Sequence, residues 1–278
     1  MKEILSYLKL TRPQNNFITA VSVLVGATIS GDVESWEKIF LACLSGFLIS
    51  AGGNSINDFF DLEIDRINKP HRPLPQGEIS PFSALVFSIS LFLIGILLSF
   101  WVKPLNILVA FIACGLLIVY SSRLKKRFLW GNLTVSLVCA LAFVYGGIAT
   151  SDFRLSLIPA VFALLFHLGR EILKDIEDLK GDAFSGASTL PIRLGIGFSL
   201  GFCSLVFSLL IVLTVFPYIF HIFSFIYLIL VILGVDLVIV YVIWSMRHDP
   251  SSSNLHHLSN ILKADTVLGL TAIYLGRF

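Results

Sequence analysis

Long apolar segments alternate with short polar stretches along almost the whole chain. A helix needs roughly 20 mostly apolar residues to cross about 30 Å of hydrocarbon. On that measure the pattern predicts nine spans, at 13–31, 38–62, 81–101, 104–121, 131–150, 154–176, 195–217, 219–246 and 260–277. At Lys103 and at Pro217 two spans follow so closely that one long helix is the alternative. We therefore expect an all-α, polytopic membrane protein, a nine-transmembrane-helix bundle in a single domain over residues 1–278.

The basic residues are distributed unequally between the loops that join these spans. Of the 20 Lys and Arg residues, only Lys38, Lys103, Arg154 and Arg277 fall on one side of the predicted membrane, and the other sixteen fall on the opposite side. Cytoplasmic loops of membrane proteins carry the excess of Lys and Arg. The asymmetry predicts a cytoplasmic N-terminus, an external C-terminus and a location in the cell membrane.

The composition agrees with a membrane protein and argues against several other classes. Hydrophobic residues make up 56% of the 278 residues, charged residues only 14%, and the mean hydropathy is +0.88. A net charge of +2 without a long block of Lys and Arg indicates no nucleic-acid binding. The four cysteines stand singly in apolar segments, which is typical of core residues and not of a metal site. No obligate protein partner is indicated.

Acidic residues gather where the second predicted span ends, in NSINDFFDLEIDR (54–66). At about 100° per residue in an α-helix, one face carries a first stripe and Glu63 points to the opposite side. The first stripe consists of Asn54, Asp58, Asp61 and Asp65. The same spacing recurs in EILKDIEDLKGD (171–182), where the second stripe consists of Glu171, Asp175, Asp178 and Asp182. The repeat predicts an internal duplication of 54–65 and 171–182, although Gly181 favours an end of the second helix before Asp182.

A single acidic stripe at the end of a span is typical of a solvated cap, but two matched stripes are not. Carboxylates on one face repel each other unless a cation neutralises them, and acidic residues near membrane segments tend to face a cavity. Hard oxygen ligands favour Mg²⁺, which usually keeps part of its water shell and bridges to phosphate oxygens. Because both stripes lie at predicted cytoplasmic ends, the pattern predicts two or three Mg²⁺ ions around one diphosphate.

Basic side chains flank both stripes. Most of them are explained by the cytoplasmic excess of Lys and Arg alone. Arg contacts phosphate in a bidentate manner and Lys acts as a point charge, so some of these residues are expected to bind the diphosphate. The residues favoured for this role are Arg72, Arg123, Lys125 and Lys174.

Several segments together resemble one known family. NDFFDLEID (57–65) resembles the NDxxDxxxD signature of the UbiA superfamily of intramembrane prenyltransferases, and DLKGD (178–182) resembles its second motif, DxxxD. The resemblance spans nearly the whole chain and includes RPQNN (12–16), NKPHRPLPQGEIS (68–80) and KGDAFSGASTLPIRLG (180–195). It implies a helical bundle with a central cavity, closed on the cytoplasmic side by the loops that bear both motifs and open laterally to lipid.

Within the superfamily, the segments around both motifs look most similar to archaeal digeranylgeranylglyceryl phosphate synthases. The resemblance implies transfer of a geranylgeranyl group from geranylgeranyl diphosphate to the free hydroxyl of geranylgeranylglyceryl phosphate, a lipid-like phosphorylated glycerol ether. This reaction forms the second ether bond of archaeal membrane lipids. An aromatic acceptor such as 4-hydroxybenzoate is the alternative within the superfamily, because acceptor choice lies in pocket walls that the motifs do not describe.

The resemblance also implies roles for individual residues. Mg²⁺ would neutralise the diphosphate as its bond to the allylic carbon breaks. The implied metal ligands are Asn54, Asn57, Asp58, Asp61, Asp65, Asp175, Asp178 and Asp182, and the implied catalytic residues are Asp61, Asp65, Asp178 and Asp182. For the two asparagines, metal binding and donation to phosphate both stay open. Glu171, Tyr120 and a phosphate oxygen are alternatives for the general base, and the loop with Ser185 is expected to close over the substrate.

A cation transporter is the alternative from another class, since acidic residues in a helical bundle also mark cation paths. Asp236 and Asp265, inside the last two predicted spans, favour it. A transporter, however, is expected to place its carboxylates near the middle of the membrane with broken helices around them. Here most of them gather at one interface beside basic loops, which favours an anionic substrate. We leave Asp236 outside the site.

Overall fold

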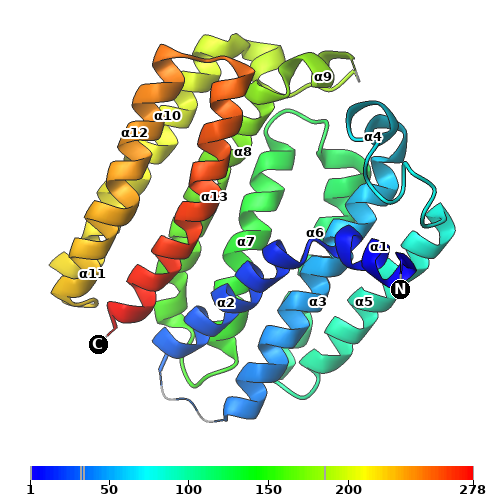
Figure 1. Cartoon of the computed structure of the whole chain (residues 1–278). Helices are drawn as coiled ribbons and strands as arrows, with labels where there is room; N and C mark the ends of the chain where they lie inside the picture. Colours follow the sequence, from blue (N-terminus) through cyan, green and yellow to red (C-terminus); the bar gives the residue numbers. More distant parts are fainter. Residues whose placement is uncertain (1, 32, 34, 185, 278) are drawn as a thin grey trace. The chain divides into compact units, whose positions relative to one another are not determined.

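The computed structural model describes residues 2–31, 33, 35–184 and 186–277, and these residues form helices joined by short turns (Figure 1). The helices are α1 Lys2–Thr11, α2 Pro13–Ile29, α3 Trp36–Phe60, α4 Leu62–Asn68, α5 Pro81–Ser99, α6 Pro104–Val119, α7 Trp130–Ile148, α8 Leu157–Glu177, α9 Leu179–Phe184, α10 Leu190–Ile219, α11 Phe225–Leu230, α12 Leu237–His248 and α13 Ser252–Leu275. Two π-helical segments, η1 Tyr120–Leu124 and η3 Val231–Asp236, and one 3₁₀ turn, η2 Arg154–Ser156, complete them. The described residues form no β-strand. Their β-type pairing is limited to one isolated bridge between Arg127 and Ser188.

Seven helical segments of the described chain are long and apolar enough to cross a membrane. They are Trp36–Phe60, Pro81–Ser99, Pro104–Leu124, Trp130–Ile148, Arg154–Glu177, Leu190–Ile219 and Phe225–His248. Each coincides with a predicted span, so the chain is an all-helical integral membrane protein. The segments expected as the first and ninth spans are also helical, as α2 and α13, but α2 has only 17 residues and neither is among the seven. The count of nine therefore stays a prediction.

The chain divides into two compact units, each described here by itself. The first unit consists of Met1–Lys125 and Leu141–Leu157, and the second consists of Lys126–Ala140 and Ile158–Phe278. Helix α7 contributes residues to both. The first acidic stripe belongs to the first unit and the second stripe belongs to the second unit.

In the first unit, α3 packs against α2, α5 and α6 (Figure 1). The C-terminal half of α7 crosses α2 at two glycines. A Cβ on Gly146 would lie 1.9 Å from the carbonyl oxygen of Val23, and one on Gly26 would lie 2.1 Å from that of Phe143. Only glycine permits this approach of two backbones, a device common where helices meet in membranes. The crossing fixes α2, and therefore the α1–α2 junction that reaches the first stripe.

In the second unit, α11, η3 and α12 follow one another as one continuous helical segment, Phe225–His248, and α13 packs against all three (Figure 1). Helix α10 packs against α11 and α12. The predicted start of a span at residue 195 coincides with a kink inside α10. Gly195 has a φ of 81°, a left-handed conformation that glycine adopts without steric cost. Pro191 stands in the first turn of α10, where its missing N–H needs no partner. The span predicted from residue 195 therefore begins at this kink, five residues after the first residue of α10.

Candidate active site

The first stripe lies on a continuous helical path with one break. Helix α3 ends at Phe60, Asp61 occupies a turn with φ −86° and ψ −1°, and α4 begins at Leu62. Helix-type hydrogen bonds continue across the break, because Asp61 N donates to Asn57 O at 2.9 Å and Asp65 N donates to Asp61 O at 2.8 Å. Asp58, Asp61 and Asp65 are therefore buried on one face, at 4%, 6% and 4% exposure.

Glu63 behaves as the helical-face argument predicts. Its side chain is 80% exposed and accepts a hydrogen bond from Arg66, whose side chain is also exposed. An ion pair so open to solvent is screened and contributes little to stability. Glu63 thus lies outside the group of buried carboxylates.

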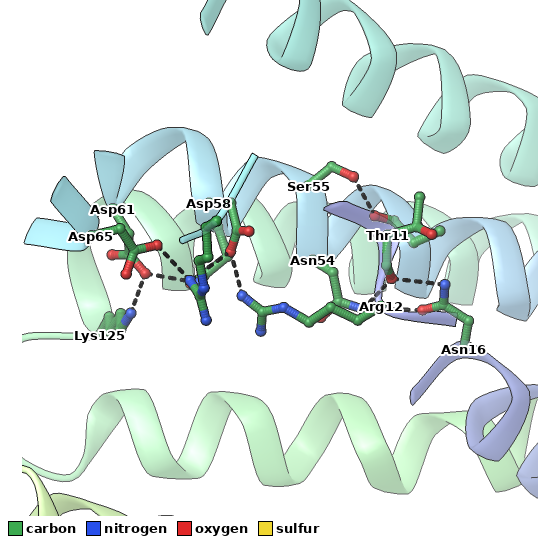
Figure 2. Close-up of polar contacts among 12 residues, drawn as sticks. Thr11, Arg12, Asn16, Asn54, Ser55, Asp58, Asp61, Asp65 and Lys125 are labelled. Carbon is green, nitrogen blue, oxygen red and sulfur yellow. Dashed lines mark hydrogen bonds and ion pairs between the residues drawn. The ribbon is translucent and has the colours of Figure 1, made fainter. Parts of the chain in front are cut away.

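Three cations hold the three buried carboxylates (Figure 2). The guanidinium of Arg72 bridges Asp58, at 3.1 Å from Oδ1, and Asp65. Arg12 also pairs with Asp58, and Lys125 pairs with Asp61. Since a buried carboxylate without a counter-charge is strongly unfavourable, these pairs account for the burial. Arg72 and Lys125, two of the residues expected to bind diphosphate, thus lie at the first stripe.

Arg12 is the residue of this group that the sequence analysis did not select. It links α1 to α2 with a φ of 53°, a left-handed conformation that is uncommon for a non-glycine residue. The following Pro13 disfavours the right-handed helical conformation at Arg12 and starts α2. The sequence feature that could have indicated Arg12 is the segment RPQNN (12–16), which is part of the family resemblance. The loop pattern accounts for Arg12 only as one of the basic residues on the cytoplasmic side.

The two asparagines have different surroundings. Asn54 Nδ2 donates to Thr11 O and to Asn16 Oδ1, both at 3.0 Å, so Asn54 ties α3 to the α1–α2 junction (Figure 2). Asn57 Nδ2 donates to Asp61 Oδ2 at 2.8 Å. The oxygen Oδ1 of Asn57 is buried and has no hydrogen-bond partner among the described residues. A buried carbonyl oxygen left without a donor suits a cation as its partner.

The second stripe repeats the break of the first. Helix α8 ends at Glu177, Asp178 occupies a turn, and α9 runs from Leu179 to Phe184. Asp178 N donates to Lys174 O at 2.9 Å, and Asp182 N donates to Asp178 O at 3.0 Å. The break at Asp178 thus falls three residues before Gly181. Helix α9 passes through Gly181, so that part of the expectation is wrong.

The side chains of the second stripe have other partners. Asp175 Oδ2 accepts a hydrogen bond from Asn132 Nδ2 at 2.8 Å, while Asp178 is exposed and Asp182 is half-buried. Glu171 binds two cations, since Lys174 Nζ lies 2.8 Å and Arg170 Nη1 lies 3.4 Å from its Oε1. Lys174 therefore pairs with Glu171, which has the first position in the second stripe, as Asn54 has in the first.

The remaining expected residues are dispersed. Arg123 is exposed and makes no ion pair with a described residue. Glu177, next to the stripe, accepts a hydrogen bond from His256 Nδ1 at 2.7 Å and so is held by α13. Ser185, expected in a loop over the substrate, lies outside the described residues.

The donor chemistry of both stripes fits Mg²⁺, although the described residues form no preassembled metal site. Carboxylate and amide oxygens are the ligands that Mg²⁺ prefers. Within the described part of the chain, no group of three or more His, Cys, Asp or Glu side chains surrounds a metal position. At the first stripe, Arg72, Arg12 and Lys125 each pair with an oxygen of these carboxylates: Oδ1 of Asp58, Oδ2 of Asp61 and Oδ2 of Asp65. A metal ion there competes with these cations for the carboxylates.

Comparison with known proteins gives consistent results. The sequence profile of the UbiA prenyltransferase family matches residues 19–261. The digeranylgeranylglyceryl phosphate synthase of Methanosphaera stadtmanae is 37% identical over 270 residues, which cover 97% of this chain and 98% of that protein. A solved structure of a digeranylgeranylglyceryl phosphate synthase is 34% identical, with a TM-score of 0.82 over 100% of this chain and 99% of the other. A UbiA homologue from Archaeoglobus fulgidus, solved with GPP and Mg²⁺, shares the fold at 19% identity, with a TM-score of 0.72 over 96% of this chain and 99% of the other.

Proposed function

Because the chain belongs to the UbiA prenyltransferase family, we propose that it transfers a geranylgeranyl group from geranylgeranyl diphosphate to geranylgeranylglyceryl phosphate. The product is the doubly alkylated lipid in which the second ether bond of archaeal membrane lipids has formed. The choice of substrates is supported by the sequence identity of 37% with a digeranylgeranylglyceryl phosphate synthase over nearly its full length. The resemblance inferred from the two acidic motifs is thereby confirmed at the level of the family.

One observation of the structure carries the proposal. Two segments of the chain, 54–65 and 171–182, each present three aspartates on a helix–turn–helix path with the break at the same position. Duplicated carboxylates beside Arg and Lys suit a metal-bound diphosphate, whose charge needs both kinds of partner. An internal duplication accounts for the match and stays part of the proposal.

We assign Mg²⁺ binding to the two stripes. The proposed ligands are Asn57, Asp58, Asp61 and Asp65 in the first, and Asp175, Asp178 and Asp182 in the second. Bound Mg²⁺ would supply charge neutralisation for the leaving diphosphate. Asn54 has its amide nitrogen fixed by Thr11 and Asn16, so Oδ1 is the only atom with which it would contribute.

The basic residues of the first stripe then have two successive tasks. In the structure, Arg12, Arg72 and Lys125 neutralise buried carboxylates. When the metal-bound diphosphate enters, these side chains are proposed to turn from carboxylate to phosphate oxygens. There they stabilise the negative charge that grows as the C1–O bond breaks. The acceptor hydroxyl attacks C1 and loses its proton, for which Glu171, Tyr120 and a phosphate oxygen remain alternatives.

The proposal includes a topology with nine spans, a cytoplasmic N-terminus and an active site toward the cytoplasm. The helices α2 and α13 at the expected first and last spans support the count. The excess of Lys and Arg in the loops beside both stripes supports the orientation.

An acceptor panel tests the proposed reaction. Purified protein is incubated with Mg²⁺, labelled geranylgeranyl diphosphate and either geranylgeranylglyceryl phosphate or 4-hydroxybenzoate. We expect the diether product with the glycerol phosphate and none with the aromatic acid. Product from 4-hydroxybenzoate alone would assign the chain to aromatic prenylation. No turnover with either acceptor, together with cation flux into vesicles that contain the protein, would instead support a transporter.

A further inference from the structure

A second group of buried polar side chains lies in the second unit, away from the second stripe. Thr214 on α10, Tyr227 on α11, Asp236 at the end of η3 and Asp265 on α13 form it. Thr214 Oγ1 lies 3.2 Å from both carboxylate oxygens of Asp236, and Tyr227 Oη donates to Thr214 O at 2.7 Å. Asp236 stands near the middle of the span Phe225–His248, and Asp265 stands near the middle of α13.

Asp265 has no partner for either carboxylate oxygen. Its exposure is 3%, and neither oxygen accepts or donates a hydrogen bond among the described residues. Helices η3 and α13 are adjacent here, since a Cβ on Gly234 would lie 3.8 Å from Leu268 and one on Gly269 would lie 3.9 Å from Val235. Asp265 lies one turn from these contacts and interacts electrostatically with Asp236. The buried, unpartnered carboxylate of Asp265 thus lies on the helix that packs against η3, within electrostatic range of Asp236.

The Thr214 hydroxyl is a single hydrogen-bond donor, which is fewer than this group of oxygen atoms requires. It carries one proton, and Oγ1 lies closer to Ile211 O, at 2.7 Å, than to Asp236. When that proton is donated to Ile211, the hydroxyl oxygen and the Asp236 carboxylate face each other as two acceptors. Two acceptors in such an arrangement need either a proton on Asp236 or a cation bound between them.

Protonation is the alternative to a bound cation. A protonated Asp265 would donate to Asp236 and a protonated Asp236 would donate to Thr214 Oγ1, so stability would then depend on pH and not on the added salt. Neither aspartate forms an ion pair with a described basic side chain. The π-helical turn that ends at Asp236 adds an independent sign, because such turns occur frequently at functional sites.

We propose that Asp236, Asp265 and the Thr214 hydroxyl bind a hard cation between α10, η3 and α13, at a site separate from the two aspartate stripes. Two carboxylates and a hydroxyl are oxygen ligands of the kind that Na⁺, Mg²⁺ and Ca²⁺ share. A divalent ion neutralises the two carboxylates and a monovalent ion halves their charge. In either case the ion links α13 to α10 and η3, which Thr214 and Asp236 already connect. The site is independent of the prenyl transfer proposed above.

Thermal unfolding in different salts tests the site. An Asp61→Asn/Asp178→Asn protein, in which both stripes are weakened, is purified with N-methylglucamine as the sole added cation. Na⁺, K⁺, Mg²⁺ or Ca²⁺ is then added at constant ionic strength. We expect a rise in Tm of about 5 °C at 100 times the dissociation constant of the preferred ion. Whether Na⁺ or a divalent ion produces the rise identifies the class of cation.

Matched variants in the same background assign the response to the site. Asp265→Asn and Asp236→Asn are expected to abolish the rise, whereas Asp249→Asn, at an exposed aspartate after α12, is expected to retain it. A Tm that is equal in all salts would overturn the proposal, as would a rise that Asp265→Asn leaves unchanged. If either variant fails to fold, equilibrium dialysis of the background protein with radioactive sodium or calcium decides. We expect about one ion bound per chain, and none bound would overturn the site.

Discussion

The two acidic stripes share a backbone but differ in how their charges are compensated. Both follow a helix, a turn at Asp61 or Asp178, and a short second helix. At the first stripe every buried carboxylate pairs with Arg or Lys. At the second, Asp175 is held by the neutral amide of Asn132, and the cations pair with Glu171 instead. The two segments thus share the spacing of their carboxylates, while the residues that compensate the charges differ.

This difference in charge compensation indicates that the two stripes contribute differently to binding of metal and diphosphate. The carboxylates of the first stripe are balanced by Arg12, Arg72 and Lys125, the cations that we propose to move to the diphosphate. The second stripe presents Asp175 and Asp178 without a paired cation among the described residues. Metal is therefore expected to meet less competition at the second stripe. The predictions below test this contrast.

The largest effect is expected from the turn aspartates. Asp61→Asn and Asp178→Asn should each lower kcat/KM by about 100-fold or more, because each removes charge that is needed where the diphosphate gains it. Glu63→Gln and Glu177→Gln serve as matched controls, since Glu63 is exposed and Glu177 pairs with His256. Steady-state rates with Mg²⁺ decide. Comparable losses in all four variants would show that the helical-face assignment is wrong.

A large loss of stability is expected from Arg72→Gln. This change leaves Asp58 and Asp65 short of their shared cation, at a cost of about 2–3 kcal/mol because the Arg72 side chain is only 19% exposed. The expected fall in Tm is about 5–10 °C by the usual conversion. Arg66→Gln, which removes the exposed pair with Glu63, is the control and should shift Tm by less than about 1 °C. Equal shifts in thermal unfolding would mean that burial at the first stripe does not depend on pairing.

A moderate effect on metal affinity is expected from Asn132→Ala. The amide of Asn132 orients Asp175, and loss of such a supporting hydrogen bond typically weakens metal binding about 10-fold or more. The Mg²⁺ concentration for half-maximal rate should rise accordingly, while the rate at saturating Mg²⁺ stays near that of the unmodified protein. A fall in the saturating rate with unchanged Mg²⁺ dependence would assign Asn132 another role.

The smallest effect is expected from Arg123→Ala. Arg123 is exposed and lacks a pair among the described residues, whereas Lys125, two positions later, holds Asp61. Activity should fall less than about 2-fold for Arg123→Ala and about 10-fold for Lys125→Ala, in line with the loss of one charged contact to a carboxylate. The reverse order in the same assay would place the diphosphate beside Arg123.

The sequence predicted the features that depend on local periodicity. Asp58, Asp61 and Asp65 share a face because helix-type hydrogen bonds continue through the break at Asp61. The seven apolar helices were visible as runs of adequate length, since lipid requires satisfied backbone groups throughout a span. The family followed from the combination of motifs.

Contacts between distant segments were not predictable in the same way. The pairing of Arg12 with Asp58 joins residues 46 positions apart and depends on the left-handed junction before Pro13. Lys174 was expected at the diphosphate, but Glu171 stands one helical turn away and competes for it. Helix α8 ends at Glu177 because of the turn at Asp178. No glycine or proline at this position indicates the turn in the sequence.

Dependence of turnover on Mg²⁺ is the most direct test of the proposed division between aspartates and cations. The purified protein is stripped with EDTA, supplied with labelled geranylgeranyl diphosphate and geranylgeranylglyceryl phosphate, and assayed before and after Mg²⁺ is restored. We predict no diether product in EDTA and full recovery with Mg²⁺, because Arg12, Arg72 and Lys125 alone do not neutralise both the carboxylates and the leaving diphosphate. Undiminished turnover in EDTA would contradict a metal role for both stripes.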